Sequence, residues 1–315
     1  MNDREASRLD DAARAGWLYY VAGNTQDEIA RKLGVSRQSA QRLVAMAVSE
    51  RLVKVRLDHP IARCMELARQ LTDRYALIRC EVVPSDPSAP GLVTGVAIAG
   101  AAEMERHLKS VDPKILALGT GRTLRACVEQ LSEMDCPQHR IVSRLGNMMH
   151  DGSATPYNVV IRMAERVGAR HYPMPLPVFA RSPEERALLA EQEPVRNTMD
   201  LCDRADATFV GVGQIDETAP LLVDGFLTHD ELRALVGQGV AGEITSWLYD
   251  SEGRILTGGS NQRILSAPLG PAGEAPVVGI AAGPLKVPAL HAALRGRLLN
   301  AVITDEATAE SLISG

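Results

Sequence analysis

The stretch NTQDEIARKLGVSRQSAQRL, residues 24–43, predicts two short helices joined by a tight turn. Thr25 can cap the first helix and form a capping box with Glu28, which stands three residues later. Gly34 is the residue best able to adopt the left-handed backbone of the turn, and Ser36 can cap the second helix. This pattern predicts a helix-turn-helix.

Apolar residues at helical spacing would give this motif a small core. We expect a preceding helix over residues 10–22, ended by Gly23 and Asn24. Its expected buried side chains are Ala13, Trp17, Leu18 and Tyr20 or Val21. The two helices of the motif would bury Ile29, Ala30, Leu33, Ala40, Leu43, Val44 and Ala47.

The outer face of the second helix carries the side chains Arg37, Gln38, Gln41 and Arg42. Arginine can form two parallel hydrogen bonds to guanine and glutamine can do the same with adenine, so this face suits the major groove of DNA. Hydroxyl, amide and lysine side chains suit the phosphates. We expect such contacts from Thr25, Gln26, Ser36 and Lys54. The alternative is an ordinary three-helix module whose polar residues are only solvated.

The segment ERLVKVRLD, residues 50–58, alternates apolar Val53, Val55 and Leu57 with basic Lys54 and Arg56. Alternation predicts a short strand with one basic face, as in a wing that lies along the DNA backbone. Residues 1–57 are therefore predicted to form a winged helix-turn-helix DNA-binding domain.

Charge is distributed unevenly along the chain, whose net charge is −5. Residues 1–57 hold ten Lys/Arg and seven Asp/Glu, whereas residues 58–315 hold 24 Lys/Arg and 32 Asp/Glu. A basic segment joined to an acidic body suits a DNA-binding domain attached to a larger module.

Composition excludes several classes of protein. Aromatic residues are only 3%, which argues against stacking platforms for single-stranded nucleic acid. No apolar run approaches the roughly 20 residues of a membrane span, and the start of the chain lacks the apolar stretch of a signal peptide. The five cysteines are scattered without a C-x-x-C pair. We therefore expect buried thiols in a reducing cytoplasm, with no metal site and no disulfide framework.

Residues 60–75, PIARCMELARQLTDRY, predict an amphipathic linker helix within residues 58–76. Its apolar stripe is Ile61, Met65, Leu67 or Ala68, and Leu71. The stripe can pack on the next domain, or it can dimerise the chain and so set the spacing of two operator half-sites. The spacing is compatible with both.

From about residue 77, short apolar runs alternate with helical patterns. Strands are expected over residues 77–83, 114–119, 140–146, 206–213, 276–283 and 298–305, and helices over 94–108, 122–131 and 156–168. This alternation predicts an α/β domain over residues 58–315, with a mostly parallel sheet and helices on both faces. Ligands of such sheets bind beyond the carboxyl ends of the strands.

Glycine and polar residues follow several of these strands. One group opens a predicted helix and could cradle an anion with backbone N–H groups, two hydroxyls and a guanidinium: Gly119, Thr120, Gly121, Arg122 and Thr123. A glycine turn needed only for a tight strand-to-helix connection explains the same pattern. Other strand ends offer further candidates that could converge on one pocket: Gly146, Asn147, Gln214, Asp250 and Lys286.

The chain resembles the SorC family of sugar-binding transcriptional regulators, which includes the deoxyribonucleoside and central-glycolytic-gene regulators. The resemblance covers nearly the whole chain. It rests on TQDEIARKLGVSRQSAQRLV, ALGTGRTL, FVGVGQI, GEITSWLYDSEGRIL and the ending GIAAGPLKVPALHAALRGRLLNAVITDEATAESLI.

The resemblance implies an effector domain similar to sugar-phosphate isomerase and deaminase folds, a phosphorylated sugar or polyol as effector, and a homodimer or homotetramer. It places the phosphate at residues 119–123 and the rest of the pocket at Gly146, Asn147, Asp250 and Lys286. Pro284 departs from the family's pattern at the final strand end, which leaves the identity of the effector open.

The leading hypothesis is a transcriptional regulator that needs no cofactor and whose affinity for double-stranded operator DNA is controlled by a phosphorylated sugar or polyol. The alternative is a sugar-phosphate isomerase or deaminase with an accessory DNA-binding head. Such an enzyme needs a general base beside the substrate, for which Asp250 and His291 are the candidates. A third possibility is an unphosphorylated polyol as effector. The sequence leaves the operator, the sign of regulation and the choice between dimer and tetramer open.

Overall fold

The computed structural model describes residues 3–50, 52–53, 61–89, 91–149 and 152–315. The chain divides into two compact units, Met1–His59 and Pro60–Gly315. None of the described helices is both long and apolar enough to cross a membrane.

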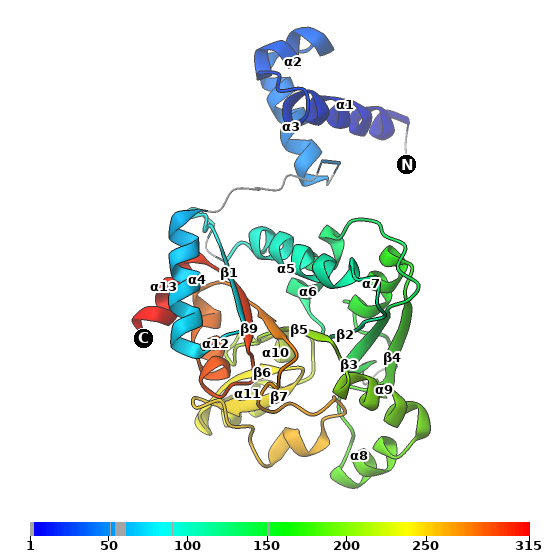
Figure 1. Cartoon of the computed structure of the whole chain (residues 1–315), viewed down its shortest axis with the longest axis vertical. Helices are drawn as coiled ribbons and strands as arrows, with labels where there is room; N and C mark the ends of the chain where they lie inside the picture. Colours follow the sequence, from blue (N-terminus) through cyan, green and yellow to red (C-terminus); the bar gives the residue numbers. More distant parts are fainter. Residues whose placement is uncertain (1–2, 51, 54–60, 90, 150–151) are drawn as a thin grey trace. The chain divides into compact units, whose positions relative to one another are not determined.

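The first unit contains α1 (Asp3–Tyr20), α2 (Gln26–Leu33) and α3 (Arg37–Ser49), as Figure 1 shows. Thr25 and Glu28 form the predicted capping box, in which the Thr25 N–H donates to the Glu28 carboxylate at 2.7 Å. Gly34 adopts a left-handed backbone with φ of 66°, and the Ser36 hydroxyl caps α3. Lys54, Val55, Arg56 and Leu57 of the expected wing strand lie outside the described residues.

The buried face of α1 differs from the predicted one. The large apolar side chains expected inside are instead exposed: Trp17, Tyr20 and Val21. Ala12 and Ala15 are fully buried in their place. A Cβ at Gly16 would lie only 2.7 Å from the Cβ of Ala47 in α3, so the two helices approach closely. Only small side chains fit that contact, which is why the helix turns its large apolar residues outward.

The second unit is built on seven parallel strands in the order β1-β9-β8-β5-β2-β3-β4. Their bounds are Arg79–Val83 for β1, Ile115–Leu118 for β2, Arg140–Met148 for β3, Arg170–Pro177 for β4, Ala207–Gly211 for β5, Val277–Ile280 for β8 and Ala301–Asp305 for β9. The predicted mostly parallel α/β fold is therefore confirmed.

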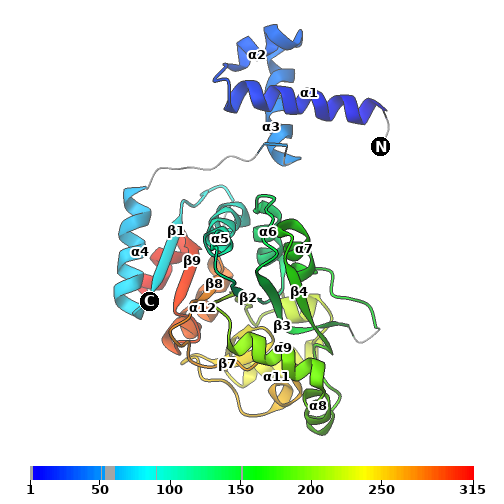
Figure 2. The same cartoon turned by 45° about the vertical axis from the view of Figure 1, so that its right-hand side comes forward.

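Helices cover both faces of this sheet (Figures 1 and 2). One face packs against α5 (Val93–Leu108), α6 (Arg122–Gln130) and α7 (Val159–Val167), and the other against α4 (Ala62–Tyr75), α9 (Glu193–Asp203), α12 (Val287–Arg295) and α13 (Glu306–Ser314). Phe209 of β5 belongs to the first core and Val210 to the second. Successive strand residues point to opposite faces, so strands covered on both faces are apolar throughout.

The linker helix α4 packs on the second unit. Cys64, Leu67 and Leu71 are buried against the core beside β1 and α13. Met65, which the predicted stripe included, is 58% exposed, so that part of the prediction was wrong. The buried stripe is Cys64, Leu67 and Leu71, so Cys64, one residue before Met65, takes the inward position.

Strand β4 was not predicted, and its composition explains why. It carries Pro173, Pro175 and Pro177, which interrupt a strand pattern. The three prolines recur at every second residue of an edge strand, so the positions between them keep the N–H groups that can pair with β3. Proline on the free edge blocks pairing with another chain.

The part of the chain that follows β5 and precedes β8 forms a smaller layer at the carboxyl ends of the strands. It contains α10 (Pro220–Val223), α11 (His229–Gly237) and the antiparallel hairpin of β6 (Val240–Ile244) and β7 (Trp247–Asp250). The backbones of Gly213 and Glu243 exchange hydrogen bonds at 2.9 Å, which ties β6 to the end of β5. The remaining elements are α8 (Pro183–Ala190), η1 (Gly259–Arg263) and η2 (Pro284–Lys286).

Candidate functional site

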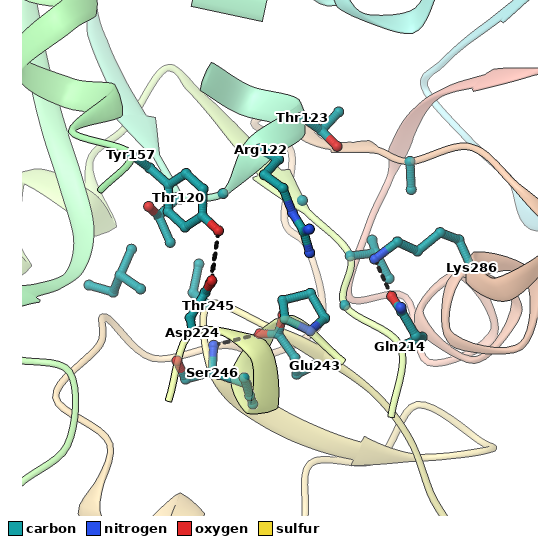
Figure 3. Close-up of a pocket in the computed structure, with 18 of the residues that line it drawn as sticks. Thr120, Arg122, Thr123, Tyr157, Gln214, Asp224, Glu243, Thr245, Ser246 and Lys286 are labelled. Atoms are coloured by element: carbon teal, nitrogen blue, oxygen red, sulfur yellow. Dashed lines mark hydrogen bonds between the residues drawn. The ribbon is translucent and has the colours of Figure 1, made fainter. Parts of the chain in front are cut away.

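A cavity of about 350 Å³ opens at the carboxyl ends of β2 and β5 (Figure 3). From β2 the chain continues to β3 on one side and later returns to β5 on the other side of β2. The loops after β2 and β5 therefore diverge, and in open α/β sheets this divergence creates the crevice in which ligands bind. The volume is typical of small-molecule sites.

The upper wall of the cavity in Figure 3 is the loop between β2 and α6. Thr120, Gly121, Arg122 and Thr123 all line it. Gly121 has φ of 110°, a conformation open to glycine, and α6 begins at the next residue without a side-chain cap. The first N–H groups of α6 are thus left for a ligand, and the helix dipole favours an anion there.

Gln214 and Lys286 form a second wall. Gln214 follows β5, Lys286 ends η2, and the Lys286 ammonium donates a hydrogen bond to the Gln214 side-chain oxygen. Burial lowers the pKa of Lys286, while the nearby Glu243 opposes that shift. The lysine is a half-buried cation that shares the cavity with Arg122.

The floor of the cavity is the turn between β6 and β7. Thr245 and Ser246 have φ of 49° and 72°, and a β-branched residue such as threonine is strained in this region. The turn presents Thr245 to the cavity with its Oγ1 lacking any hydrogen-bond partner among the described residues. Glu243 also lines the cavity and accepts the Ser246 N–H at 2.8 Å, and burial raises its pKa.

A hydrogen-bonded pair closes the remaining side. The Tyr157 hydroxyl donates to both oxygens of Asp224, at 2.9 and 3.0 Å. Burial and this carboxylate raise the pKa of Tyr157 to about 12, so the phenol stays a donor at neutral pH. The bond joins the segment before α7 to the segment after α10 across the cavity (Figure 3).

The outer face of α3 is a second candidate site. Its four predicted side chains are all exposed: Arg37, Gln38, Gln41 and Arg42. The Arg37 guanidinium lies 3.4 Å from the Asp27 carboxylate of α2, an exposed pair. Thr25 and Ser36 are the caps of α2 and α3, and Gln26 is the first residue of α2. Lys54 is not among the described residues.

Comparison with known proteins identifies the family. Residues 59–314 match the family model "Putative sugar-binding domain". The chain is 36% identical to the erythritol catabolism regulatory protein EryD of Brucella abortus over 303 residues, 96% of each protein. It is 28% identical to the transcriptional regulator LsrR of Klebsiella pneumoniae, over 96% of the chain and 92% of LsrR.

The chain belongs to the SorC family of sugar-binding transcriptional regulators. The crystal structure of the full-length sorbitol operon regulator SorC from Klebsiella pneumoniae has the same fold, with a TM-score of 0.69 and 22% identity over 97% of the chain and 99% of SorC. The relatives are transcriptional regulators and not enzymes, so the isomerase or deaminase alternative is set aside.

Within this SorC-family domain, the predicted residues Gly119, Gly146 and Asn147 line a smaller hollow of about 30 Å³, which shares Thr120 and Thr155 with the main cavity. A Cβ at Gly146 would overlap the carbonyl oxygen of Pro177 in β4. The position therefore requires glycine for the packing of β3 on β4, whatever else it contacts.

Asp250 does not line the cavity. It ends β7 opposite Val240, at the far end of the hairpin from the Thr245 turn. Its carboxylate accepts the Arg254 side chain at 2.9 Å and the backbone N–H groups of Glu252 and Arg254. His291 is also elsewhere, half-buried on α12 with its ring edge-on to Tyr75.

Several polar residues that line the cavity were not predicted from the sequence, among them Tyr157, Asp224, Glu243, Thr245 and Ser246. Glu243 had a local signal, because it stands in the GEI stretch that precedes the predicted Asp250. Because the hairpin is tight, Glu243 within β6 lines the cavity, whereas Asp250 at the end of β7 does not. Tyr157 and Asp224 give no such local signal.

Proposed function

We propose that this regulator binds operator DNA through α3 and that a phosphorylated polyol or sugar in the cavity changes the affinity of that binding. The observation that supports the phosphate is the joint presence of Arg122, Lys286 and the uncapped start of α6 on the same cavity. Charge-assisted hydrogen bonds and free helix N–H groups are what a phosphate ester prefers.

The opposite part of the cavity supports a polyhydroxy skeleton. Asp224, Glu243 and Thr245 offer oxygen atoms that can pair with ligand hydroxyls. Two relatives are named for polyol systems, erythritol catabolism for EryD and the sorbitol operon for SorC. A polyol phosphate is therefore the first ligand to test.

The DNA-binding part of the proposal rests on α3. Arg37, Gln38, Gln41 and Arg42 are exposed on one face of a capped helix, which is the arrangement that places side chains on base edges. Contacts to the DNA phosphates would come from Thr25, Gln26, Ser36 and Lys54. A two-fold operator requires two such helices, so we propose a homodimer or homotetramer, which light scattering of the full chain would measure.

The switch itself follows from linkage. A ligand changes DNA affinity only if it binds one arrangement of the chains more tightly than another. The cavity is formed by segments from β2, β5, α10, β6 and η2, so a ligand that bridges them can favour one arrangement of these segments.

The test is calorimetric titration of the full chain with erythritol phosphate and sorbitol 6-phosphate, beside plain erythritol and sorbitol. Arg122→Ala removes the guanidinium. We expect it to lower the affinity for the phosphorylated ligand by roughly 100-fold, because a strong charge-assisted contact is lost. Arg162→Ala is the matched control, because Arg162 is an exposed arginine of α7 that does not line the cavity. Equal affinity of Arg122→Ala and wild type, or tighter binding of the plain polyol, would contradict the proposal.

A further inference from the structure

The charged groups of the cavity come from different walls. Arg122 and the start of α6 lie above in Figure 3, Lys286 lies to the right, and Asp224 and Glu243 lie below. Arg125, one turn further along α6, pairs with Glu129 at 3.0 Å and does not line the cavity. The cavity therefore has one region suited to a phosphate and one that carries carboxyl groups.

The carboxylate of Asp224 is held in place by the phenol of Tyr157. An ionised carboxylate has about four lone-pair positions, and the single hydroxyl of Tyr157 leaves some of them for a ligand. A ligand hydroxyl can donate to them. A phosphate oxygen cannot, because it is itself an anionic acceptor.

The neighbouring floor carries one hydroxyl without a partner among the described residues. Thr245 is 7% exposed, its Oγ1 has no hydrogen-bond partner among the described residues, and it lines the cavity. A buried polar group without a partner is costly, so this hydroxyl points to a ligand. Glu243 beside it accepts the Ser246 N–H, and its other oxygen can take a ligand hydroxyl.

We infer that the cavity selects the monophosphate of a polyhydroxy compound and rejects the bisphosphate of the same skeleton, with Asp224 as the residue that discriminates. This inference rests on the proposed function, because it takes the phosphate to lie at Arg122 and Lys286. The far hydroxyls of the ligand then meet Asp224, Glu243 and Thr245. A second phosphate at that end would face the Asp224 carboxylate, and like charges repel.

The test compares matched pairs of ligands on the full chain by calorimetry: fructose 6-phosphate with fructose 1,6-bisphosphate, ribulose 5-phosphate with ribulose 1,5-bisphosphate, and sorbitol 6-phosphate with sorbitol 1,6-bisphosphate. For the pair whose monophosphate binds wild type most tightly, we expect the bisphosphate to bind at least about 100-fold more weakly. Asp224→Asn should narrow that gap to below about tenfold, since the amide keeps the shape but loses the charge. Asp230→Asn, an exposed carboxylate of α11, is the control that should keep the full gap.

Tyr157→Phe separates charge from hydrogen bonding. It keeps the Asp224 carboxylate, so the bisphosphate should still be rejected even if the monophosphate binds more weakly. This variant also tests the inference if Asp224→Asn does not fold. A bisphosphate that binds wild type as tightly as its monophosphate, or an unchanged gap in folded Asp224→Asn, would overturn the inference while leaving the proposed function intact. If no phosphorylated ligand binds wild type, the proposed function itself fails.

Discussion

The outer face of α3 and the cavity of the second unit place their polar and charged side chains in opposite ways. Arg37, Gln38, Gln41 and Arg42 come from six consecutive residues of one helix and are all exposed. The charged groups of the cavity, Arg122, Asp224, Glu243 and Lys286, come from four distant segments. The first surface needs only a helix to exist, whereas the second exists only when the whole sheet is assembled.

The difference has an electrostatic consequence. Exposed charges on α3 are screened by water and salt, so each contributes to a DNA contact and little to folding. Charges in the cavity and in the sheet layers are partly removed from water, so they act on stability, pKa and ligand choice together. Substitutions in the two regions should therefore fail differently.

The largest expected effect comes from a substitution in the sheet that supports the cavity. Gly146→Ala adds a Cβ that overlaps the backbone of Pro177, which cannot move as a flexible side chain could. We expect a loss of about 3 kcal/mol or more in the free energy of unfolding, measured by urea denaturation, together with loss of effector binding. Gly270→Ala is the control, because its Cβ would meet nothing within 4 Å. Equal stability of the two variants would refute the steric account.

The second effect contrasts a buried ion pair with an exposed one. The side chain of Glu103 has no exposed surface and binds Arg79 and Arg106 at 2.6 Å. Burial alone would raise the pKa of Glu103, but hydrogen bonds from His107 and Arg106 and the charge of Arg79 outweigh it and hold the pKa at about 2. Glu103→Gln should therefore cost about 2 kcal/mol of stability at pH 7, after allowance for the exposed arginines.

The pH dependence of that effect has a definite sign. A carboxyl whose pKa is depressed by folding stabilises the protein above its unfolded pKa, about 4.3, and that stability is lost as the pH falls toward about 2. The difference in unfolding free energy between wild type and Glu103→Gln should shrink across that window. Asp27→Asn, which removes the exposed partner of Arg37, should show no such trend. A constant difference at all pH values would contradict the assignment.

The smallest effect concerns base recognition by α3. Gln38→Ala removes an amide suited to adenine, and we expect roughly tenfold less discrimination between the operator and a single-base variant, with effector binding unchanged. The operator would be found by selection from random duplexes, and the affinities measured by fluorescence anisotropy at one fixed salt concentration. Arg37→Ala should lose a similar degree of discrimination at the base that Arg37 contacts. If both variants discriminated as well as wild type, the proposal that Arg37 and Gln38 recognise bases would be wrong.

The same contrast explains how far the sequence predicted the structure. The caps at Thr25 and Ser36, the left-handed Gly34 and the strand-helix alternation are local signals, so α2, α3 and most of the sheet could be predicted. Strand β4 was missed because its prolines break the strand pattern, and the outward Trp17 because the contact between α1 and α3 selects small residues. These outcomes depend on neighbours that the local sequence does not contain.

The candidate pocket divides along the same line. Residues 120–123, Gln214 and Lys286 follow strands or precede helices, and the structure brings them to one cavity. Tyr157 and Asp224 meet across 67 positions of the chain, a pairing that no local pattern records. The sequence predicts Asp250 as the acid after the GEI strand, but the two-residue hairpin turns the chain back and leaves Glu243 in the cavity instead.

The most direct test joins the two regions in one measurement. The Kd of the full chain for its selected operator is measured by fluorescence anisotropy with and without the phosphorylated ligand that binds it most tightly. We expect the ligand to change the Kd of wild type and of Arg162→Ala by at least about fivefold, a typical allosteric coupling. Arg122→Ala should bind the same operator equally well and show no change. A ligand that occupies the wild-type cavity yet leaves its operator Kd unchanged, or an Arg122→Ala protein that responds like wild type, would contradict the account.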